Sequence, residues 1–158
     1  MKLAGSWDYI ETIANKRRRD NQTPRHIDVD YLETIGAAGE LAARRFLGLK
    51  EELHTGFDNG TGFVWRGWKV DVKTTVLTNK VGYRYLQWPK GKLVKADIVF
   101  MVAVDRRTSD AVIIGFALAQ ELINAPVNKD RQHACHEIPF SLLHPAWEMY
   151  TVRPREKE

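Results

Sequence analysis

The stretch from Trp68 to Thr75 alternates charged with apolar or small residues, and this pattern most constrains how the chain can fold. Successive side chains of a strand point to opposite faces, so the stretch has a charged face and a core-directed face: Lys69, Asp71 and Lys73 against Val70, Val72 and Thr74. An Asp and a Lys two positions apart lie side by side, about 6–7 Å between Cα atoms. Such a pair suits a site where the acid binds a hard cation and the Lys steadies a water or a negatively charged oxygen. An exposed charged face on a half-buried sheet is the common alternative.

Composition limits the class of protein. The chain has 158 residues, 44% of them hydrophobic, which is typical of one folded domain with a real core. No signal-peptide pattern and no apolar run of transmembrane length occurs, and the single Cys135 fits a reducing compartment, so we expect a cytoplasmic protein with no membrane partner. A net charge of +4 and a pI of about 9.2 favour a polyanionic partner.

The N-terminal segment predicts an amphipathic helix from Ser6 to Arg19, because apolar residues recur at helical spacing. The helix ends in a run of basic residues: Lys16, Arg17, Arg18 and Arg19. These cations either complement the C-terminal helix dipole or form an arm that contacts phosphates.

A second helix is predicted from Asp28 to Phe46. Gly36 and Gly39 give it a smooth face that suggests close packing against a sheet. Glu40 follows immediately and has two interpretations. It pairs with Arg44 at the i,i+4 spacing, or it serves a site, and we favour the site because Glu40 precedes the Asp71 strand.

The segment after Gly48 predicts a strand from Glu52 to Asp58 that enters a turn, followed by a hairpin of Phe63–Trp65 and Trp68–Thr75. Asp58 is either an ordinary turn residue or a metal ligand, and the sequence leaves both open.

Further strands are predicted at 83–88, 98–104 and 111–116, the middle one buried on both faces, and a helix at 117–124. Basic residues interleaved with aromatic ones favour phosphate contact over a merely solvated surface: Lys80, Arg84, Lys90, Lys92 and Lys95. A zinc site at His133, Cys135 and His136 is disfavoured, because no second ligand pair has a matching spacing.

The order Glu40, Asp58 and Val70-Asp71-Val72-Lys73 resembles the PD-(D/E)XK nuclease superfamily, which includes restriction endonucleases and Holliday-junction resolvases. The resemblance spans about Ile35 to Val104. It implies an α/β fold with a central mixed sheet flanked by helices, a restriction endonuclease-like core. It also implies a Mg²⁺ (or Mn²⁺) site made by Asp58, Asp71, the Val72 carbonyl and often Glu40, with Lys73 beside the attacking water. Family members often place the first Asp closer to the hairpin, near Gly62.

Two classes of function follow. The first is a metal-dependent deoxyribonuclease, an endonuclease or junction resolvase, in which Glu40, Asp58, Asp71 and Lys73 are catalytic. DNA would be bound by basic residues from three segments: Arg17, Arg18, Arg19, Lys69, Lys80, Arg84 and Lys92. The second is a nucleic-acid-binding module on a nuclease-like scaffold without turnover; an RNA-directed nuclease is a weaker third. Residues 1–27 would form a helix and basic arm, 28–152 the nuclease-like domain and 153–158 a flexible tail, and a homodimer stays open.

Overall fold

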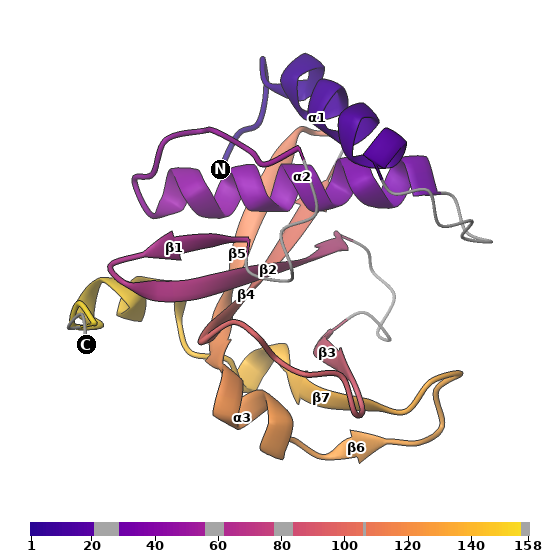
Figure 1. The fold of residues 1–158 in the computed structure, drawn as a ribbon, viewed down its shortest axis with the longest axis vertical. Coiled ribbons are helices and arrows are strands. Elements are labelled where there is room, and N and C mark those ends of the chain that lie inside the picture. The colour runs from indigo at the N-terminus through magenta and orange to yellow at the C-terminus, as the bar shows by residue number, and fades with distance from the viewer. Residues whose placement is uncertain (21–28, 56–61, 78–83, 106, 156–158) are drawn as a thin grey trace.

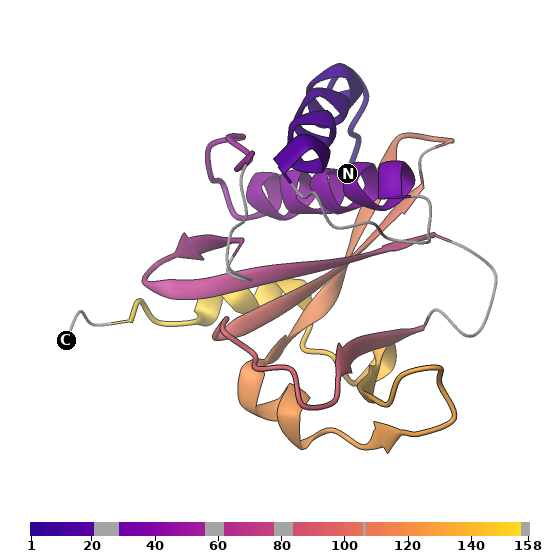
Figure 2. The ribbon, with the colours of Figure 1, turned by 45° about the vertical axis from the view of Figure 1, so that its right-hand side comes forward.

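The computed structural model describes residues 1–20, 29–55, 62–77, 84–105 and 107–155, and it arranges them in layers (Figure 1). Two helices, α1 (Trp7–Asp20) and α2 (Val29–Phe46), lie over one face of a four-stranded sheet. A smaller sheet and the short helix α3 (Ala119–Asn124) lie on its other side, and the view in Figure 2 agrees with this order. The mixed α/β content and the mixed sheet confirm this part of the expected fold class.

The first sheet has the strand order β1-β2-β4-β5. Its strands are β1 (Phe63–Trp65), β2 (Trp68–Val76), β4 (Ile98–Asp105) and β5 (Asp110–Leu118). β2 runs parallel to β4, while β1 and β5 are antiparallel to their neighbours, so the sheet is mixed. Residues 98–104 are all buried, as expected for a central strand covered on both faces.

A two-residue turn joins β1 to β2. Arg66 and Gly67 both have positive φ, 49° and 82°, which is typical of the type I′ turn that matches the twist of a hairpin. The predicted hairpin is therefore confirmed. Phe63 pairs with Val70, so β1 begins opposite the residue that precedes Asp71.

Helix α2 packs directly on β2. A Cβ atom added to Gly39 would lie 1.9 Å from Thr74 Oγ1, so only glycine allows this approach. The main core lies between the helices and the sheet, with large side chains that are fully buried: Ile10, Leu41, Val70, Ile98, Phe100 and Val102. The smooth helix face predicted around Gly39 is thus confirmed.

The second sheet was not expected from the sequence. Its order is β3-β7-β6, with β3 (Tyr85–Pro89), β7 (Cys135–Pro139) and β6 (Val127–Asn128). A second core joins it to the first sheet, through Leu86, Trp88 and Ile138 on one side and Val99 and Met101 on the other. The 3₁₀ helices η2 (Phe140–Leu142) and η3 (Ala146–Thr151) complete the chain.

Three local predictions need correction. Residues 51–55 form no strand; instead the Leu53 N–H donates to Tyr9 Oη, and the His54 carbonyl accepts from Arg17 Nε, so side chains of α1 bind this backbone. Helix α3 begins at Ala119 because the two residues before it continue β5 and pair with β4. Arg155 is not part of a loose tail: its N–H donates to the Arg66 carbonyl and its guanidinium binds Asp97 at 2.9 Å.

The described helices also bear on a membrane partner. None of them combines the length and the apolar character that a membrane crossing requires.

Candidate functional site

Asp71 and Lys73 lie side by side on β2, as the alternation predicts. Asp71 Oδ2 is 2.6 Å from Lys73 Nζ, and Asp71 Oδ1 accepts a hydrogen bond of 2.9 Å from the Val72 N–H. Asp71 is only 6% exposed. A carboxylate this far from water is stable as an anion only beside cations and donors, and Lys73 supplies such a cation.

The second sheet covers part of the charged face of β2: Lys69 is exposed, whereas Asp71 is buried and Lys73 is half-buried against Trp88. Lys73 Nζ is 4.7 Å from the centre of the Trp88 ring, and Lys92 Nζ is 5.5 Å from the same ring. Trp88 is itself buried, and its indole N–H donates to the Lys92 carbonyl at 2.9 Å. Cation–π contact thus fixes the Lys73 ammonium between Asp71 and the second sheet.

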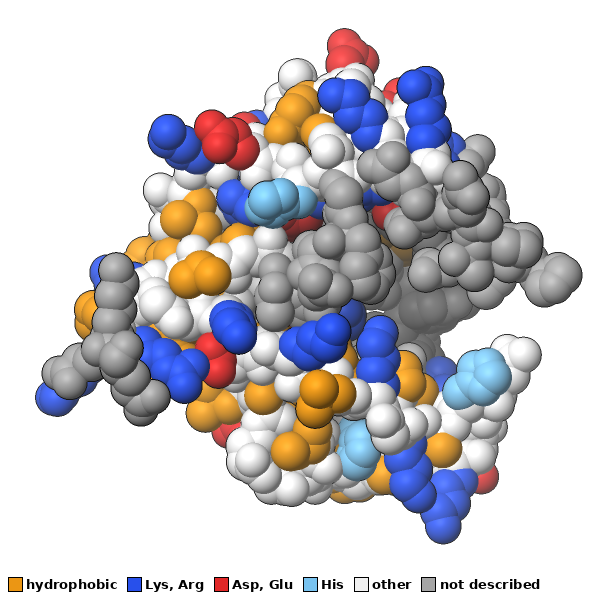
Figure 3. Space-filling view, viewed as in Figure 1, with side chains coloured by type: hydrophobic (Ala, Val, Ile, Leu, Met, Phe, Trp, Pro, Cys, Tyr) orange, Lys and Arg blue, Asp and Glu red, His pale blue; other side chains and the backbone are white. Residues whose placement is uncertain are grey.

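A cleft of about 430 Å³ opens between the two sheets beside this pair. It is lined by residues of both sheets and of the segment before β7: Lys73, Thr74, Thr75, Tyr85, Gln87, Met101 and Arg131. Figure 3 shows Lys and Arg side chains along the boundary between the first sheet and the second. Two cations, Lys73 and Arg131, therefore line the cleft next to Asp71.

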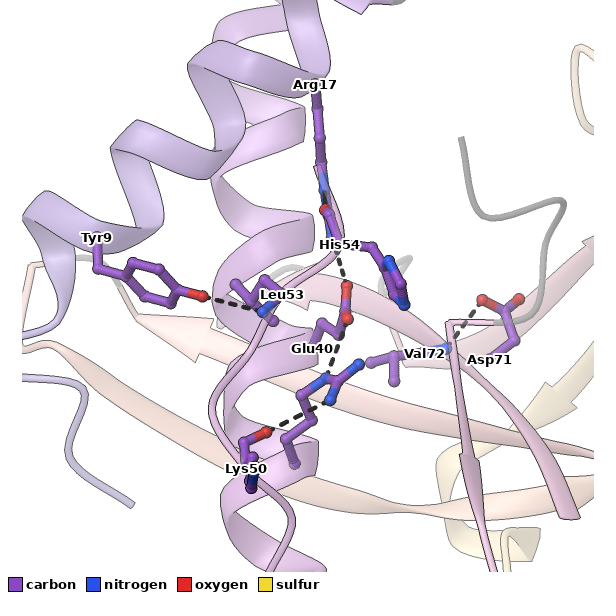
Figure 4. Close-up of polar contacts among 9 residues, drawn as sticks. Tyr9, Arg17, Glu40, Lys50, Leu53, His54, Asp71 and Val72 are labelled. Carbon is purple, nitrogen blue, oxygen red and sulfur yellow. Dashed lines mark hydrogen bonds and ion pairs between the residues drawn. The ribbon is translucent and has the colours of Figure 1, made fainter. Parts of the chain in front are cut away.

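Glu40 lies in a different environment. Its Oε2 is 2.7 Å from Arg17 Nη2 and its Oε1 is 3.2 Å from Arg44 Nε. Figure 4 shows Arg17 pointing toward Glu40 and bound to the His54 carbonyl. Glu40 projects from the helix that covers one face of β2, whereas Asp71 shares the opposite face with Lys73.

The predicted metal ligands are brought together only in part. Within the described ranges, no group of three or more His, Cys, Asp or Glu side chains is placed to hold a metal ion. Asp58 lies outside these ranges, so its role stays a prediction. The donors near Asp71 are hard oxygens, its carboxylate and the Val72 carbonyl, and Mg²⁺ commonly takes one or two carboxylates together with water and substrate phosphate. These oxygens are the ligand type that Mg²⁺ takes, but both Asp71 oxygens already contact the Val72 N–H and Lys73, so a Mg²⁺ site here stays a prediction.

The basic residues predicted to bind nucleic acid differ in their contacts. Arg17 is mostly buried against Glu40, and Arg18 donates to Asn15 on its own helix. Exposed residues include Arg19 at the end of α1, Lys69 on β2, and Arg84 and Lys92 at the two sides of β3. Lys80 lies outside the described ranges.

Sequence reasoning missed a polar network on the second sheet. Glu137 is 8% exposed and accepts hydrogen bonds from three side chains: Arg131 Nε at 2.6 Å, Gln87 Nε2 at 2.9 Å and Asn128 Nδ2 at 3.1 Å. Gln87 and Glu137 are register partners on β3 and β7, far apart in the sequence. Only the strand pairing could have revealed this network, and the sequence gives no signal for β7.

Comparison with protein-family models, with curated proteins and with solved structures finds no match to this chain. The function therefore has to be inferred from the chemistry of the site itself.

Proposed function

We propose that the protein is a Mg²⁺-dependent DNA nuclease that hydrolyses phosphodiester bonds at Asp71 and Lys73. The observation that carries this proposal is the nearly buried Asp71 carboxylate, 2.6 Å from the Lys73 ammonium, beside a cleft whose lining includes Lys73 and Arg131. The parallel pairing of β2 with β4, and the packing of α2 on β2, support a restriction endonuclease-like core.

Each residue would have a distinct part. Asp71 and the Val72 carbonyl would hold Mg²⁺ or Mn²⁺, together with Asp58 as the sequence predicts. The ion would polarise the scissile phosphate and lower the pKa of a bound water. Lys73 would donate to the oxygen on which negative charge develops, and its contacts with Asp71 and Trp88 hold the ammonium in place before substrate arrives.

A binding module without turnover is the second candidate, and the environment of Glu40 favours it. Both Glu40 oxygens are bound by arginines, so this acid is occupied by structural partners. A site that lacks Glu40 as a ligand has fewer carboxylates to hold a metal ion, and Asp58 would have to complete it.

Cleavage assays separate the two candidates. Wild-type protein is incubated with supercoiled, linear, branched and single-stranded DNA and with RNA, in Mg²⁺ or Mn²⁺. We expect DNA to be cut, Asp71→Asn to abolish cleavage, and Lys73→Met to lower turnover by about a hundredfold or more. Asp110→Asn is the matched control, because Asp110 also pairs with a lysine, Lys2 at 2.9 Å, but at the far end of β5. DNA binding without cleavage of any substrate would establish the binding module instead.

A further inference from the structure

The cleft between the two sheets has cations on its walls and carboxylates behind them. Lys73 and Arg131 both line it, whereas no Asp or Glu does among the described residues. The acids that pair with these cations, Asp71 and Glu137, are each less than a tenth exposed. The two ion pairs therefore present their positive ends to the cleft, which suits an anionic group.

The Arg131 side chain is held in one orientation, although the residue lies in the loop between β6 and β7. Glu137 binds its Nε at 2.6 Å and is itself held by Gln87 and Asn128, so the orientation of the guanidinium is fixed from β3, β6 and β7. A fixed, planar guanidinium loses little freedom when it binds an oxyanion, and its fork of donors matches phosphate.

The cleft also contains groups that suit a nucleobase. Tyr85 and Gln87, two positions apart on β3, both line it, and Met101 adds an apolar surface. Aromatic rings stack on bases that are not already stacked in a duplex. A volume of about 430 Å³ is typical of a site for one small molecule and is far too small for a double helix.

We propose that this cleft binds one unpaired nucleotide of single-stranded DNA, with its phosphate between Lys73 and Arg131 and its base against Tyr85. The proposal rests on the proposed nuclease function and specifies its substrate: an unpaired strand, or a duplex end or junction with an unpaired nucleotide. Because Lys73 belongs to both sites, the bound nucleotide lies next to the scissile bond.

Binding measurements test the proposal apart from cleavage. The full chain is titrated in EDTA against a labelled single-stranded oligonucleotide, the same sequence as a blunt duplex, and the same sequence as RNA. We expect the single strand to bind more tightly than the duplex. Tyr85→Leu should weaken single-strand binding about five- to hundredfold, the range expected for one base–aromatic stack. Tyr85→Phe keeps the ring and should bind the single strand about as tightly as the wild type.

Arg131 is tested against a neighbour of equal charge. Arg131→Ala should weaken single-strand binding about tenfold or more, whereas Lys129→Ala should have a much smaller effect, because Lys129 is exposed in the same segment but does not line the cleft. Arg131→Lys keeps the positive charge but not the planar fork of donors, and it serves as the control for a folding defect in Arg131→Ala. Its affinity for the single strand should lie between those of the wild type and Arg131→Ala.

Three results would overturn the proposal. Equal losses of single-strand affinity in Arg131→Ala and Lys129→Ala would mean that binding is general electrostatic attraction. Equal affinity for duplex and single strand would show that the cleft does not select an unpaired nucleotide. Tighter binding of the RNA would assign the cleft to the other nucleic acid. If any of these results is obtained and the wild-type protein still cuts blunt duplex DNA, the nuclease function stands and only the assignment of this cleft is refuted.

Discussion

Gly39→Ala tests how α2 is seated on the strand that carries the site. In an isolated helix, Ala is more stable than Gly by about 1 kcal/mol, so propensity alone predicts a more stable protein. The structure predicts the opposite. A Cβ atom at this position would lie 1.9 Å from Thr74 Oγ1, 2.7 Å from its Cγ2 and 2.8 Å from its Cβ.

The size of the effect follows from these three contacts. Rotation of the Thr74 side chain moves Oγ1 and Cγ2 but leaves Cβ where it is, so α2 or β2 must shift as well. Forcing an extra carbon into a packed core costs about 1–3 kcal/mol, and the upper end applies when backbone must move. After the gain in helix propensity, we expect a net loss of about 2 kcal/mol. For a chain of this length, the loss lowers Tm by about 4–8 °C.

The assay is thermal and urea unfolding of Gly39→Ala beside Gly36→Ala. Gly36 lies on the same helix, and a Cβ there meets nothing within 4 Å, so Gly36→Ala should be neutral or stabilising by up to about 1 kcal/mol. Adding Thr74→Ala to Gly39→Ala removes the two shortest contacts and should recover part of the loss. Equal stability for Gly39→Ala and Gly36→Ala would refute the close approach of α2 to β2.

Two further predictions concern ion pairs. Glu40→Ala should destabilise the protein by about 3–5 kcal/mol in urea unfolding, because it leaves Arg17 and Arg44 mostly buried without their anion; a loss of cleavage with unchanged stability would instead make Glu40 a metal ligand. His144 lies 2.7 Å from Glu121 and 3.5 Å from Glu148, and the hydrogen bond with Glu121 is the main cause of the raised pKa of His144. A raised pKa stabilises the fold below the ordinary value of about 6.5, and this stabilisation is lost as pH rises through the folded value. The difference in Tm between wild type and His144→Gln should therefore shrink from pH 6 to pH 9, and a difference independent of pH would contradict the ion pair.

The alternation of the Asp71 strand predicted more of the fold than any other pattern. It assigned Val70 to the core and Asp71 with Lys73 to the opposite face, and the structure agrees on both. It succeeded because strand periodicity is local and needs no knowledge of the partner strands. The continuous apolar run of β4 predicted a strand buried on both faces for the same reason.

The surroundings of that strand could not be predicted in this way. The second sheet joins Trp88 to His136 and Gln87 to Glu137, residues about fifty positions apart, and no local pattern specifies such pairs. The ion pair of Arg17 with Glu40 likewise depends on how α1 crosses α2. Because the Arg44 pairing with Glu40 lies within one helix, sequence spacing offered it as one of two interpretations, though not the favoured one. It gave no sign of the Arg17 pairing.

Of the three acids singled out by the sequence, the two that the structure describes, Glu40 and Asp71, have different physical explanations. Glu40 binds Arg17 of α1 and Arg44 of α2, and Arg17 also binds the His54 carbonyl, so the charge of Glu40 bridges two helices and the segment that follows α2. The bonds of Asp71 to the Val72 N–H and to Lys73 lie within one strand, and Lys73 in turn contacts the Trp88 ring of the second sheet. A buried Asp–Lys pair is often no more stable than an apolar pair of similar volume, so stability alone gives no reason for charge at these positions. The pair lies beside a cleft whose lining includes Lys73 and Arg131, and the proposed nuclease function would give a reason for the charge that stability does not.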